Sequence, residues 1–404
     1  MADITVSAAS VAGVTRGMRN VVFVSQYVGY WFQIGTNTDL FYCKTTDGGK
    51  TWGAEVSIKA DTLVGFDVWY DQWTPGDTGR NIHIWMFYST TDEVKYNRLN
   101  TVNDALAGET MVLDIASAVA GRGTFISGTK TRGGNLYCAF DVDAGAEKGL
   151  YRSTDNGATW GSRTDPIDAS LDQCKLFPAN AADSQDMWML FHDATNNVIS
   201  VKTHDDSANT NSESSTLAMT EEGTDTVGQY GFDGSIRHSD GHLIFAYMDA
   251  YDAAGASDFK VYDFDGTNLT ALTDIATNVD SIYYPSVFLN QDQPDWIYVA
   301  YLGVTAGTST LTTSMPVLYA LSKDRGVSWT KDIAYSTSTT DYAHCWAPNN
   351  GEKFQVFWYD ISGTDIITNH DNSKDFGFTP LNNYQAPRAV GQNNTGVMQV
   401  AGRG

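Results

Sequence analysis

The chain alternates short apolar runs with polar turns that often contain glycine. Seven of the runs are almost entirely apolar and aromatic, and they read "GYWFQIG", "HIWMFYS", "LYCAFDV", "MWMLFHD", "LIFAYMD", "WIYVAYL" and "FQVFWYD". Strands that are buried on both faces have this composition, whereas half-buried strands alternate apolar and polar residues. No convincing amphipathic helical pattern occurs in the sequence. The pattern therefore predicts an all-β protein whose central strands are packed between layers.

The apolar runs belong to a repeating unit of about 55 residues. In the second unit, the runs "GFDVWYDQW", "NIHIWMFYS" and "EVKYNRLN" precede a polar turn, and "ETMVLDIA" follows it. Four-stranded units that repeat around a circle form a β-propeller, whose closure leaves only short sheet edges. The spacing predicts a seven-bladed β-propeller of four-stranded antiparallel blades. Six blades is the main alternative, and eight would require units of about 50 residues.

The repeat covers most of the chain. We place a single propeller domain at residues 1–387 and a Gly-rich C-terminal tail at residues 388–404. Residues 3–9 are expected to add an outer strand that closes the ring. The predicted blades cover approximately residues 11–60, 61–118, 119–168, 169–222, 223–278, 279–336 and 337–387.

A polar octapeptide recurs three times between the runs. It reads "TTDGGKTW" at 45–52, "STDNGATW" at 153–160 and "SKDRGVSW" at 322–329, so the shared pattern is hydroxyl-x-Asp-x-Gly-x-hydroxyl-Trp. The Asp side chain can accept backbone N–H bonds across a tight turn, the Gly tolerates positive φ, and the Trp is buried as the next strand begins. The segment "SKDFGFTP" at 373–380 keeps the pattern except that Pro380 replaces the Trp. Shorter remnants read "TVND", "THDD" and "DFDG", and they fall where the missing copies are expected.

These octapeptides resemble the Asp-box, or bacterial neuraminidase repeat, of the sialidase-like β-propeller family. The resemblance implies a propeller in which each box is a structural turn between the third and fourth strands of a blade. The residues to which it assigns this role are Asp47, Gly49, Trp52, Asp155, Gly157, Trp160, Asp324, Gly326, Trp329, Asp375 and Gly377. Families with this box include sialidases, other glycan-active propellers and non-catalytic propellers, so the resemblance implies the fold more than the chemistry.

The functional site is expected on the face opposite the boxes, where the segments that join one blade to the next should lie. Carboxylates there can accept hydrogen bonds from sugar hydroxyls, Arg can bind an acidic substituent, and aromatic rings can cover apolar sugar faces. A water-filled channel lined by polar residues of the inner strands is the alternative. The candidate catalytic residues are Arg16 (or Arg19), Arg122, Arg237, Asp67, Asp233 and Tyr283, and the candidate binding residues are Phe66, Tyr230, Tyr284, Tyr342 and His344.

The resemblance can be compared with sialidase chemistry, which uses three Arg on the substrate carboxylate, an Asp acid/base and a Tyr nucleophile backed by Glu. Arg16 or Arg19, Arg122 and Arg237 fall in the first, third and fifth predicted blades and could converge. However, the N-terminal Phe-Arg-Ile-Pro signature is absent, and no Glu is evidently paired with an inner-strand Tyr. Other catalytic signatures, such as G-x-S-x-G and H-E-x-x-H, are also absent. The pattern therefore favours a non-enzymatic protein.

Composition excludes several classes of partner. With 25 Lys and Arg against 48 Asp and Glu, the net charge is -23, which argues against nucleic acid and anionic membranes because these need a basic surface. No apolar run is long enough to span a membrane, and the N-terminus does not resemble a signal peptide, so we expect synthesis in the cytosol. The four Cys are scattered and the His are dispersed, so we predict reduced core thiols, no metal site and no cofactor. Ca²⁺ bound by the acidic loops at 141–147 or 249–258 is the alternative.

The leading hypothesis is a non-enzymatic recognition or structural propeller that binds a glycan or a virion protein. The lack of an export signal, together with large Gly/Ser/Thr loops of the kind found in surface-exposed glycan binders, favours a bacteriophage head- or tail-associated protein. The bacterial cytoplasm is the alternative location. Two other functions are kept: a sialidase-like glycoside hydrolase or polysaccharide lyase that acts on acidic glycans, and an assembly factor that docks a protein partner.

Overall fold

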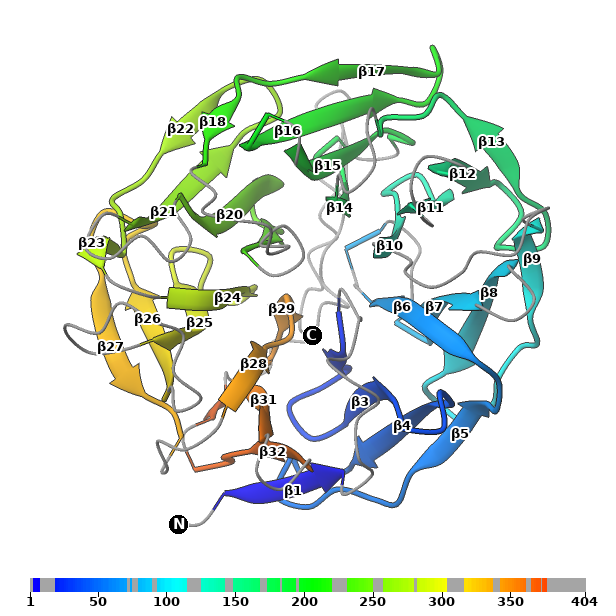
Figure 1. The fold of residues 1–404 in the computed structure, drawn as a ribbon, viewed down its shortest axis with the longest axis horizontal. Coiled ribbons are helices and arrows are strands. Elements are labelled where there is room, and N and C mark those ends of the chain that lie inside the picture. The colour runs from blue at the N-terminus through cyan, green and yellow to red at the C-terminus, as the bar shows by residue number, and fades with distance from the viewer. Residues whose placement is uncertain are drawn as a thin grey trace, which may run out of the picture.

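The computed structural model is a ring of seven four-stranded antiparallel blades around a central axis (Figure 1). This confirms the predicted all-β, seven-bladed propeller and rules out the six-bladed alternative. The structure describes residues 3–7, 19–70, 73–74, 79–88, 93–114, 125–141, 148–167, 173–181, 184–193, 196–219, 231–249, 257–279, 282–303, 316–336, 342–360, 365–371 and 373–375. Within these ranges every regular element is a strand, and no helix is long and apolar enough to cross a membrane.

The strands of each blade follow one another from the axis to the rim. Blades one and two contain β2 (Val21–Phe23), β3 (Gly29–Ile34), β4 (Leu40–Thr45) and β5 (Val56–Lys59), then β6 (Leu63–Trp69), β7 (Asn81–Tyr88), β8 (Glu93–Asn100) and β9 (Thr110–Asp114). Blades three and four contain β10 (Phe125–Lys130), β11 (Leu136–Asp141), β12 (Lys148–Ser153) and β13 (Gly161–Arg163), then β14 (Gln173–Pro178), β15 (Met187–Asp193), β16 (Val198–Asp205) and β17 (Thr210–Glu213), with β18 (Leu217–Ala218) also on β16. Blades five and six contain β19 (Phe232–Arg237), β20 (His242–Met248), β21 (Ser257–Phe264) and β22 (Leu269–Ala271), with β23 (Ala276–Val279) on β21, then β24 (Ile282–Asn290), β25 (Ile297–Gly303), β26 (Val317–Ser322) and β27 (Thr330–Ala334). Blade seven contains β28 (Tyr342–Trp346), β31 (Phe357–Asp360), β32 (Asp365–Thr368) and β1 (Ile4–Ser7); β29 (Asn350–Gly351) pairs with β24, and β30 (Lys353–Phe354) with β33 (Lys374–Asp375).

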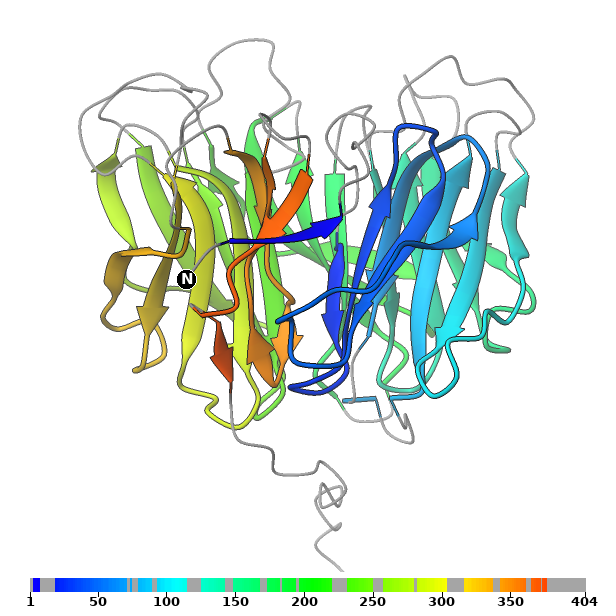
Figure 2. The same ribbon diagram turned by 90° about the horizontal axis from the view of Figure 1, so that it is seen from below.

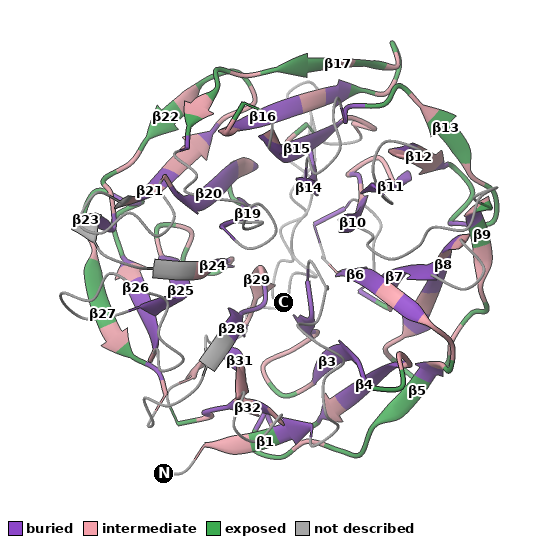
Figure 3. Ribbon diagram, in the orientation of Figure 1, coloured by how far each residue is buried: buried purple, intermediate pink, exposed green. Residues whose placement is uncertain are grey.

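The apolar runs of the sequence form the second strands, which are buried between neighbouring blades (Figure 3). Large side chains fill the spaces between blades, and Trp31, Trp85, Trp188 and Trp358 are each less than 2% exposed. At Gly128 a Cβ atom would lie 2.2 Å from the Trp85 ring, so that position of blade three is pressed against blade two. The rim strands are mostly exposed because they have no further layer outside them (Figure 3).

The ring is closed by a strand from the opposite end of the chain. β1 pairs antiparallel with β32, with Ile4 opposite Thr368, so it is the rim strand of blade seven. Figure 2, which views the ring from its side, shows β1 outside the other strands of that blade. Asn369 donates a side-chain hydrogen bond of 2.8 Å to Asp3 next to this pairing.

The three complete octapeptides are turns between the third and fourth strands of blades one, three and six. In blade three, the Oγ of Ser153 donates to Asp155 at 2.8 Å and accepts the N–H of Gly157 at 2.8 Å. Asp155 also accepts the N–H of Thr159 at 2.9 Å and its hydroxyl at 2.7 Å. The equivalent bonds around Asp47 and Asp324 have the same partners and nearly the same lengths. These Asp residues therefore hold the turn.

Each complete box also contacts the preceding blade. The Trp52 ring lies 5.4 Å from Phe357 of blade seven, and the Trp160 ring lies 5.5 Å from Tyr96 of blade two. Trp329 donates from its indole nitrogen to a blade-five carbonyl at 2.8 Å. All three Trp side chains are half-buried, so they join adjacent blades at the surface.

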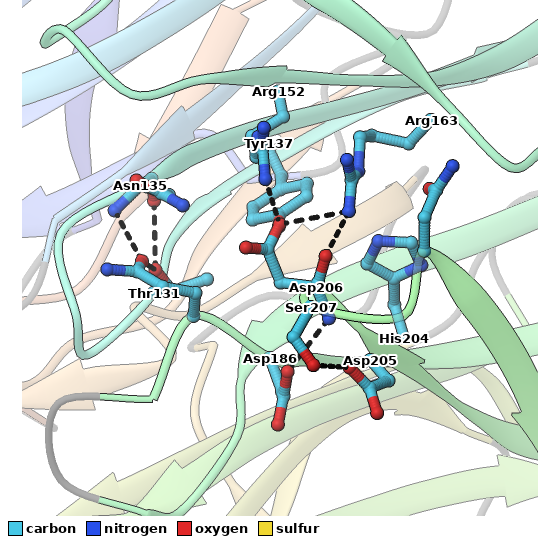
Figure 4. Close-up of polar contacts among 12 residues, drawn as sticks. Thr131, Asn135, Tyr137, Arg152, Arg163, Asp186, His204, Asp205, Asp206 and Ser207 are labelled. Carbon is cyan, nitrogen blue, oxygen red and sulfur yellow. Dashed lines mark hydrogen bonds and ion pairs between the residues drawn. The ribbon is translucent and has the colours of Figure 1, made fainter.

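The remnant turns of blades two and four, which occupy the box position, are held differently. In blade four, Asp206 accepts a bond of 2.6 Å from Arg152 and a short bond from Tyr137, both in blade three (Figure 4). Arg163 of blade three donates to the backbone carbonyl of the same Asp (Figure 4). The last Asp of the blade-two remnant has matching partners, since Asp104 accepts from Tyr30 at 2.7 Å and from Lys44 at 2.7 Å, both in blade one. In both remnants, therefore, the carboxylate of the last Asp accepts hydrogen bonds from side chains of the preceding blade.

The segment "SKDFGFTP" begins in blade seven, where β33 pairs with β30. Gly377, Pro380 and the predicted tail at 388–404 lie outside the described residues.

Candidate functional site

The inner strands of neighbouring blades are joined by polar side chains that accept backbone N–H groups. Asp67 of blade two accepts the N–H of Gly128 of blade three at 2.8 Å. The same arrangement recurs at three further junctions. Ser127 accepts the N–H of Leu176 at 3.1 Å. Asp233 accepts the N–H of Val287 at 2.8 Å, and Ser286 accepts the N–H of Ala347 at 2.9 Å. A buried backbone N–H without a partner is costly, so each of these acceptors stabilises one junction between blades.

Arg19 crosses the centre of the ring from the segment before β2. Its Nη1 donates to Asp67 at 2.9 Å and to the Gly128 carbonyl at 2.8 Å, and its Nη2 donates to the Leu176 carbonyl at 2.6 Å. Its guanidinium also lies 4.6 Å from the Trp69 ring. Burial raises the pKa of Asp67 to about 6, although Arg19 opposes that rise. Arg19 and Asp67 are therefore a buried ion pair that ties blades one to four together.

A second buried ion pair joins blades four and five. Lys175 donates to Asp233 at 2.7 Å, with side chains only 8% and 5% exposed. The other carboxylate oxygen of Asp233 accepts from Val287 and, at 3.3 Å, from Asn349. Both inner-strand carboxylates are thus engaged in structural bonds.

A small pocket that opens to solvent lies beside these ion pairs. The inner strands that line it enter from the face opposite the boxes, and most lining residues come from their entry halves, whereas those of blade seven reach beyond the end of β28. The lining residues are Arg19, Asn20, Lys175, Phe232, Asp233, Tyr284, Pro285, Ser286, His344, Cys345, Trp346, Ala347 and Asn349. The pocket therefore belongs to the face on which the sequence predicts the functional site.

Tyr284 is held in the pocket wall by an unusual backbone. Its φ is 58°, a left-handed conformation that is rare for a bulky residue, and it precedes Pro285. The pairing of β24 with β25 is irregular between Tyr283 and Ser286, which is typical of a β-bulge. Cys345 donates its thiol to the Tyr284 carbonyl at 3.2 Å. Strained conformations of this kind concentrate at functional sites, where surrounding contacts maintain them.

Three aromatic side chains follow one another along this wall. The ring centroids of Tyr284 and His344 are 4.0 Å apart, and those of His344 and Trp346 are 5.6 Å apart with nearly parallel planes. Burial lowers the pKa of His344 to about 3, so its ring is neutral at neutral pH. His344 and Trp346 are 3% and 9% exposed, and Trp346 packs on Trp31, so of the three rings only that of the half-buried Tyr284 offers appreciable uncharged aromatic surface.

Side chains from several blades also meet on the box face. Trp73, which follows β6 on the box face, stacks on His238 of blade five with centroids 5.2 Å apart and planes inclined by 5°. The guanidinium of Arg132 from blade three lies 3.9 Å from the Trp73 ring. Arg132 also donates to the Asn180 carbonyl of blade four at 2.5 Å. These contacts join four blades at the box face.

The structure brings only some of the predicted site residues together. Asp233, Tyr284 and His344 line the pocket, and Asp67 lies beside it as the partner of Arg19. Phe66 is fully buried in the core between blades one and two, because neighbours along a strand point to opposite sides. Its predicted role in binding is therefore not supported.

Arg237 lies away from the pocket and does not converge with Arg19. It is the last residue of inner strand β19 and so reaches the box face, where it donates to Asp240 at 2.9 Å and to Asp263 at 2.9 Å. Its predicted catalytic role is corrected to that of a structural cation. Arg16, Arg122 and Tyr230 lie outside the described residues, and Tyr283 and Tyr342 are described only as backbone in β24 and β28.

Nine lining residues were not predicted, and four of them are Asn20, Lys175, Trp346 and Asn349. Lys175 had a detectable signal, since it is a cation within the otherwise apolar inner strand "QCKLFP". The other three carry no local signal, because their approach depends on how three blades meet at the axis.

The fold and the pocket define a seven-bladed β-propeller with a small central pocket. No family model matches the chain, and no curated protein matches it. Among solved structures, it is similar to an ulvan lyase from a new family of polysaccharide lyases, with a TM-score of 0.56, 11% identity, and coverage of 91% of this chain and 94% of the lyase. The same lyase bound to -[GlcA(1-4)Rha3S]- matches with a TM-score of 0.56, 12% identity and the same coverage. A triple-arginine mutant of AofleA from Arthrobotrys oligospora matches with a TM-score of 0.50 and 11% identity over 84% of this chain and 97% of that one. At these identities the similarity shows a shared fold alone.

Proposed function

We propose that this protein binds carbohydrate and that one sugar residue of a glycan binds over the mouth of the central pocket. The observation that carries this proposal is the half-buried ring of Tyr284 in the pocket wall, which the buried ring of His344 backs at 4.0 Å. Aromatic faces suit the apolar C–H faces of sugars, and a few polar groups beside them fix orientation. Asn20 supplies a polar group of this kind, because its Oδ1 has no hydrogen-bond partner within the described residues. The strained backbone of Tyr284 supports a functional role for its ring.

We favour binding over hydrolysis because the central carboxylates are engaged. Most glycosidases need one carboxyl group as acid and a second as nucleophile or base. Asp67 is bonded to Arg19, Ser127 and Gly128, and Asp233 to Lys175 and a backbone N–H. Among the described residues, the pocket lining holds no other carboxylate.

A polysaccharide lyase is the second candidate. Similarity in fold to the ulvan lyase supports it, whereas His344 is a poor base at neutral pH because burial lowers its pKa to about 3. The comparisons support these carbohydrate-directed roles better than a virion role. Two hypotheses are left: that the protein is associated with a bacteriophage particle, and that its partner is a virion protein and not a glycan. Co-purification of the chain with particles would test them.

The test is a glycan array followed by calorimetry on the full chain. Tyr284→Asn removes the ring but keeps a residue that tolerates positive φ, and we expect it to abolish detectable binding. Tyr27→Ala is the matched control, because Tyr27 is 59% exposed in a turn on the box face. Binding that survives Tyr284→Asn would contradict the proposed pocket. Release of unsaturated products from a bound polysaccharide would instead identify a lyase.

A further inference from the structure

We propose that the pocket selects an uncharged, hydroxyl-rich sugar residue and discriminates against uronate and sulfated residues. This inference rests on the proposed carbohydrate binding and specifies the class of sugar. It departs from the acidic glycans that the resemblance to sialidases implies, and it comes from the pairing of charges in the pocket.

Both cations of the pocket have dedicated carboxylates. Arg19 is paired with Asp67 at 2.9 Å, with side chains 5% and 0% exposed. Lys175 is paired with Asp233 at 2.7 Å. An anionic substituent would lose its water shell on entry and would find each cation already neutralised. To gain a partner it would have to break a pair that also holds two blades together.

His344 adds no positive charge. Its pKa is lowered to about 3 by burial, so it cannot attract an anion at neutral pH. The whole chain carries a formal charge of -23, which repels polyanionic glycans before they reach the pocket.

The clearest sign of a ligand group is an unused acceptor on Asn20. This side chain lines the pocket and is 1% exposed. Its Nδ2 donates to the Phe32 carbonyl at 3.2 Å, which fixes the orientation of the amide. Its Oδ1 is buried and has no hydrogen-bond partner within the described residues. A sugar hydroxyl can donate to this oxygen, whereas an ionised carboxylate or sulfate has no proton to donate.

The experiment uses matched oligosaccharide pairs that differ only at C6. β-linked glucan and glucuronan of equal length form one pair, and β-linked mannan and mannuronan form another. Titration calorimetry on the wild-type chain should show that the better neutral member binds at least about tenfold tighter than its uronate counterpart. The affinity for this neutral oligosaccharide should be the same at about 50 mM and 500 mM NaCl, because no net charge is recognised.

Asn20→Ala should lower the affinity for the neutral oligosaccharide by roughly tenfold, because the sugar hydroxyl loses its acceptor. Asn97→Ala is the matched control, because Asn97 is a buried Asn in β8 outside the pocket lining. Preference for the uronate member, with affinity that falls as salt rises, would overturn the inference and leave carbohydrate binding intact. Absence of binding to every glycan on the array would overturn the proposed function itself.

Discussion

The turns between third and fourth strands occupy equivalent places but are held in two different ways. In blade three, Asp155 bonds within its own octapeptide, to Ser153 and Thr159. In blade four, Asp206 instead accepts bonds from Tyr137 and Arg152 of the preceding blade. The bonds of the complete box are therefore local, whereas Asp206 bonds to the neighbouring blade. In blade five the remnant is again local, because Asp265 accepts bonds from Thr267 and Asn268 of its own turn. Contacts between blades thus compensate for loss of the octapeptide in blades two and four.

The box glycine should show the largest effect, because it combines a special backbone with a close contact. Gly157 has φ of 87°, and a Cβ there would lie 2.1 Å from the Tyr96 ring. We expect Gly157→Ala to lower the free energy of unfolding by about 2–4 kcal/mol. Gly134→Ala is the control, since Gly134 has φ of 102° but nothing within 4 Å. In denaturant titrations, Gly134→Ala should lower the free energy of unfolding by about 1 kcal/mol. Equal losses would mean that contact with blade two contributes nothing.

The remnant carboxylate should come next. Asp206→Ala leaves Tyr137 and Arg152 without their acceptor, and we expect a loss of about 1–3 kcal/mol. Asp205→Ala should cost less, because Asp205 is exposed and bonds only within its own turn. A double-mutant cycle with Arg152→Ala measures the coupling across the two blades. Strictly additive losses would show that the remnant does not depend on its neighbour.

The box hydroxyl should have a smaller effect that stays local. Ser153→Ala removes the acceptor of the Gly157 N–H and a donor to Asp155, and we expect a loss of about 1 kcal/mol. A cycle with a blade-two variant such as Tyr96→Phe should show no coupling. Glycan affinity should be unchanged, since the turn lies on the face away from the pocket. A change in affinity with an unaltered melting curve would contradict the assignment of faces.

Acid should weaken both kinds of turn slightly. The hydroxyl of Thr159 lowers the pKa of Asp155 to about 2. Burial opposes the shift at Asp206, but bonds from Tyr137 and Arg152 lower its pKa as well. A carboxyl whose pKa is lowered in the fold stabilises it above the unfolded value near 4, and that contribution is lost as pH falls toward 2. Asp155→Asn and Asp206→Asn should each flatten the decline in melting temperature over this range. A decline as steep as that of the parent chain would exclude these carboxyls as its source.

The architecture could be predicted from sequence because each blade contains its own apolar second strand, and three blades also contain the octapeptide. Seven apolar runs and three octapeptides fix the number of blades and the face on which the turns lie. The pocket could be predicted only in part. Tyr284 and His344 were found from their place between blades, but the pairing of Lys175 with Asp233 and the unused acceptor of Asn20 depend on how separate strands meet at the axis. Arg237 was misplaced because its position at the end of β19, and hence its face, follows from strand length.

The seam between β1 and β32 also governs the order of folding. Ile4 must pair with Thr368, so nearly the whole chain lies between the two halves of this contact. Pairings of such long range form slowly because the intervening chain must first be ordered, whereas each hairpin of a blade forms from neighbouring residues. The blades can therefore assemble one after another as an open arc. Blade seven receives its rim strand only when that arc has brought its two ends together.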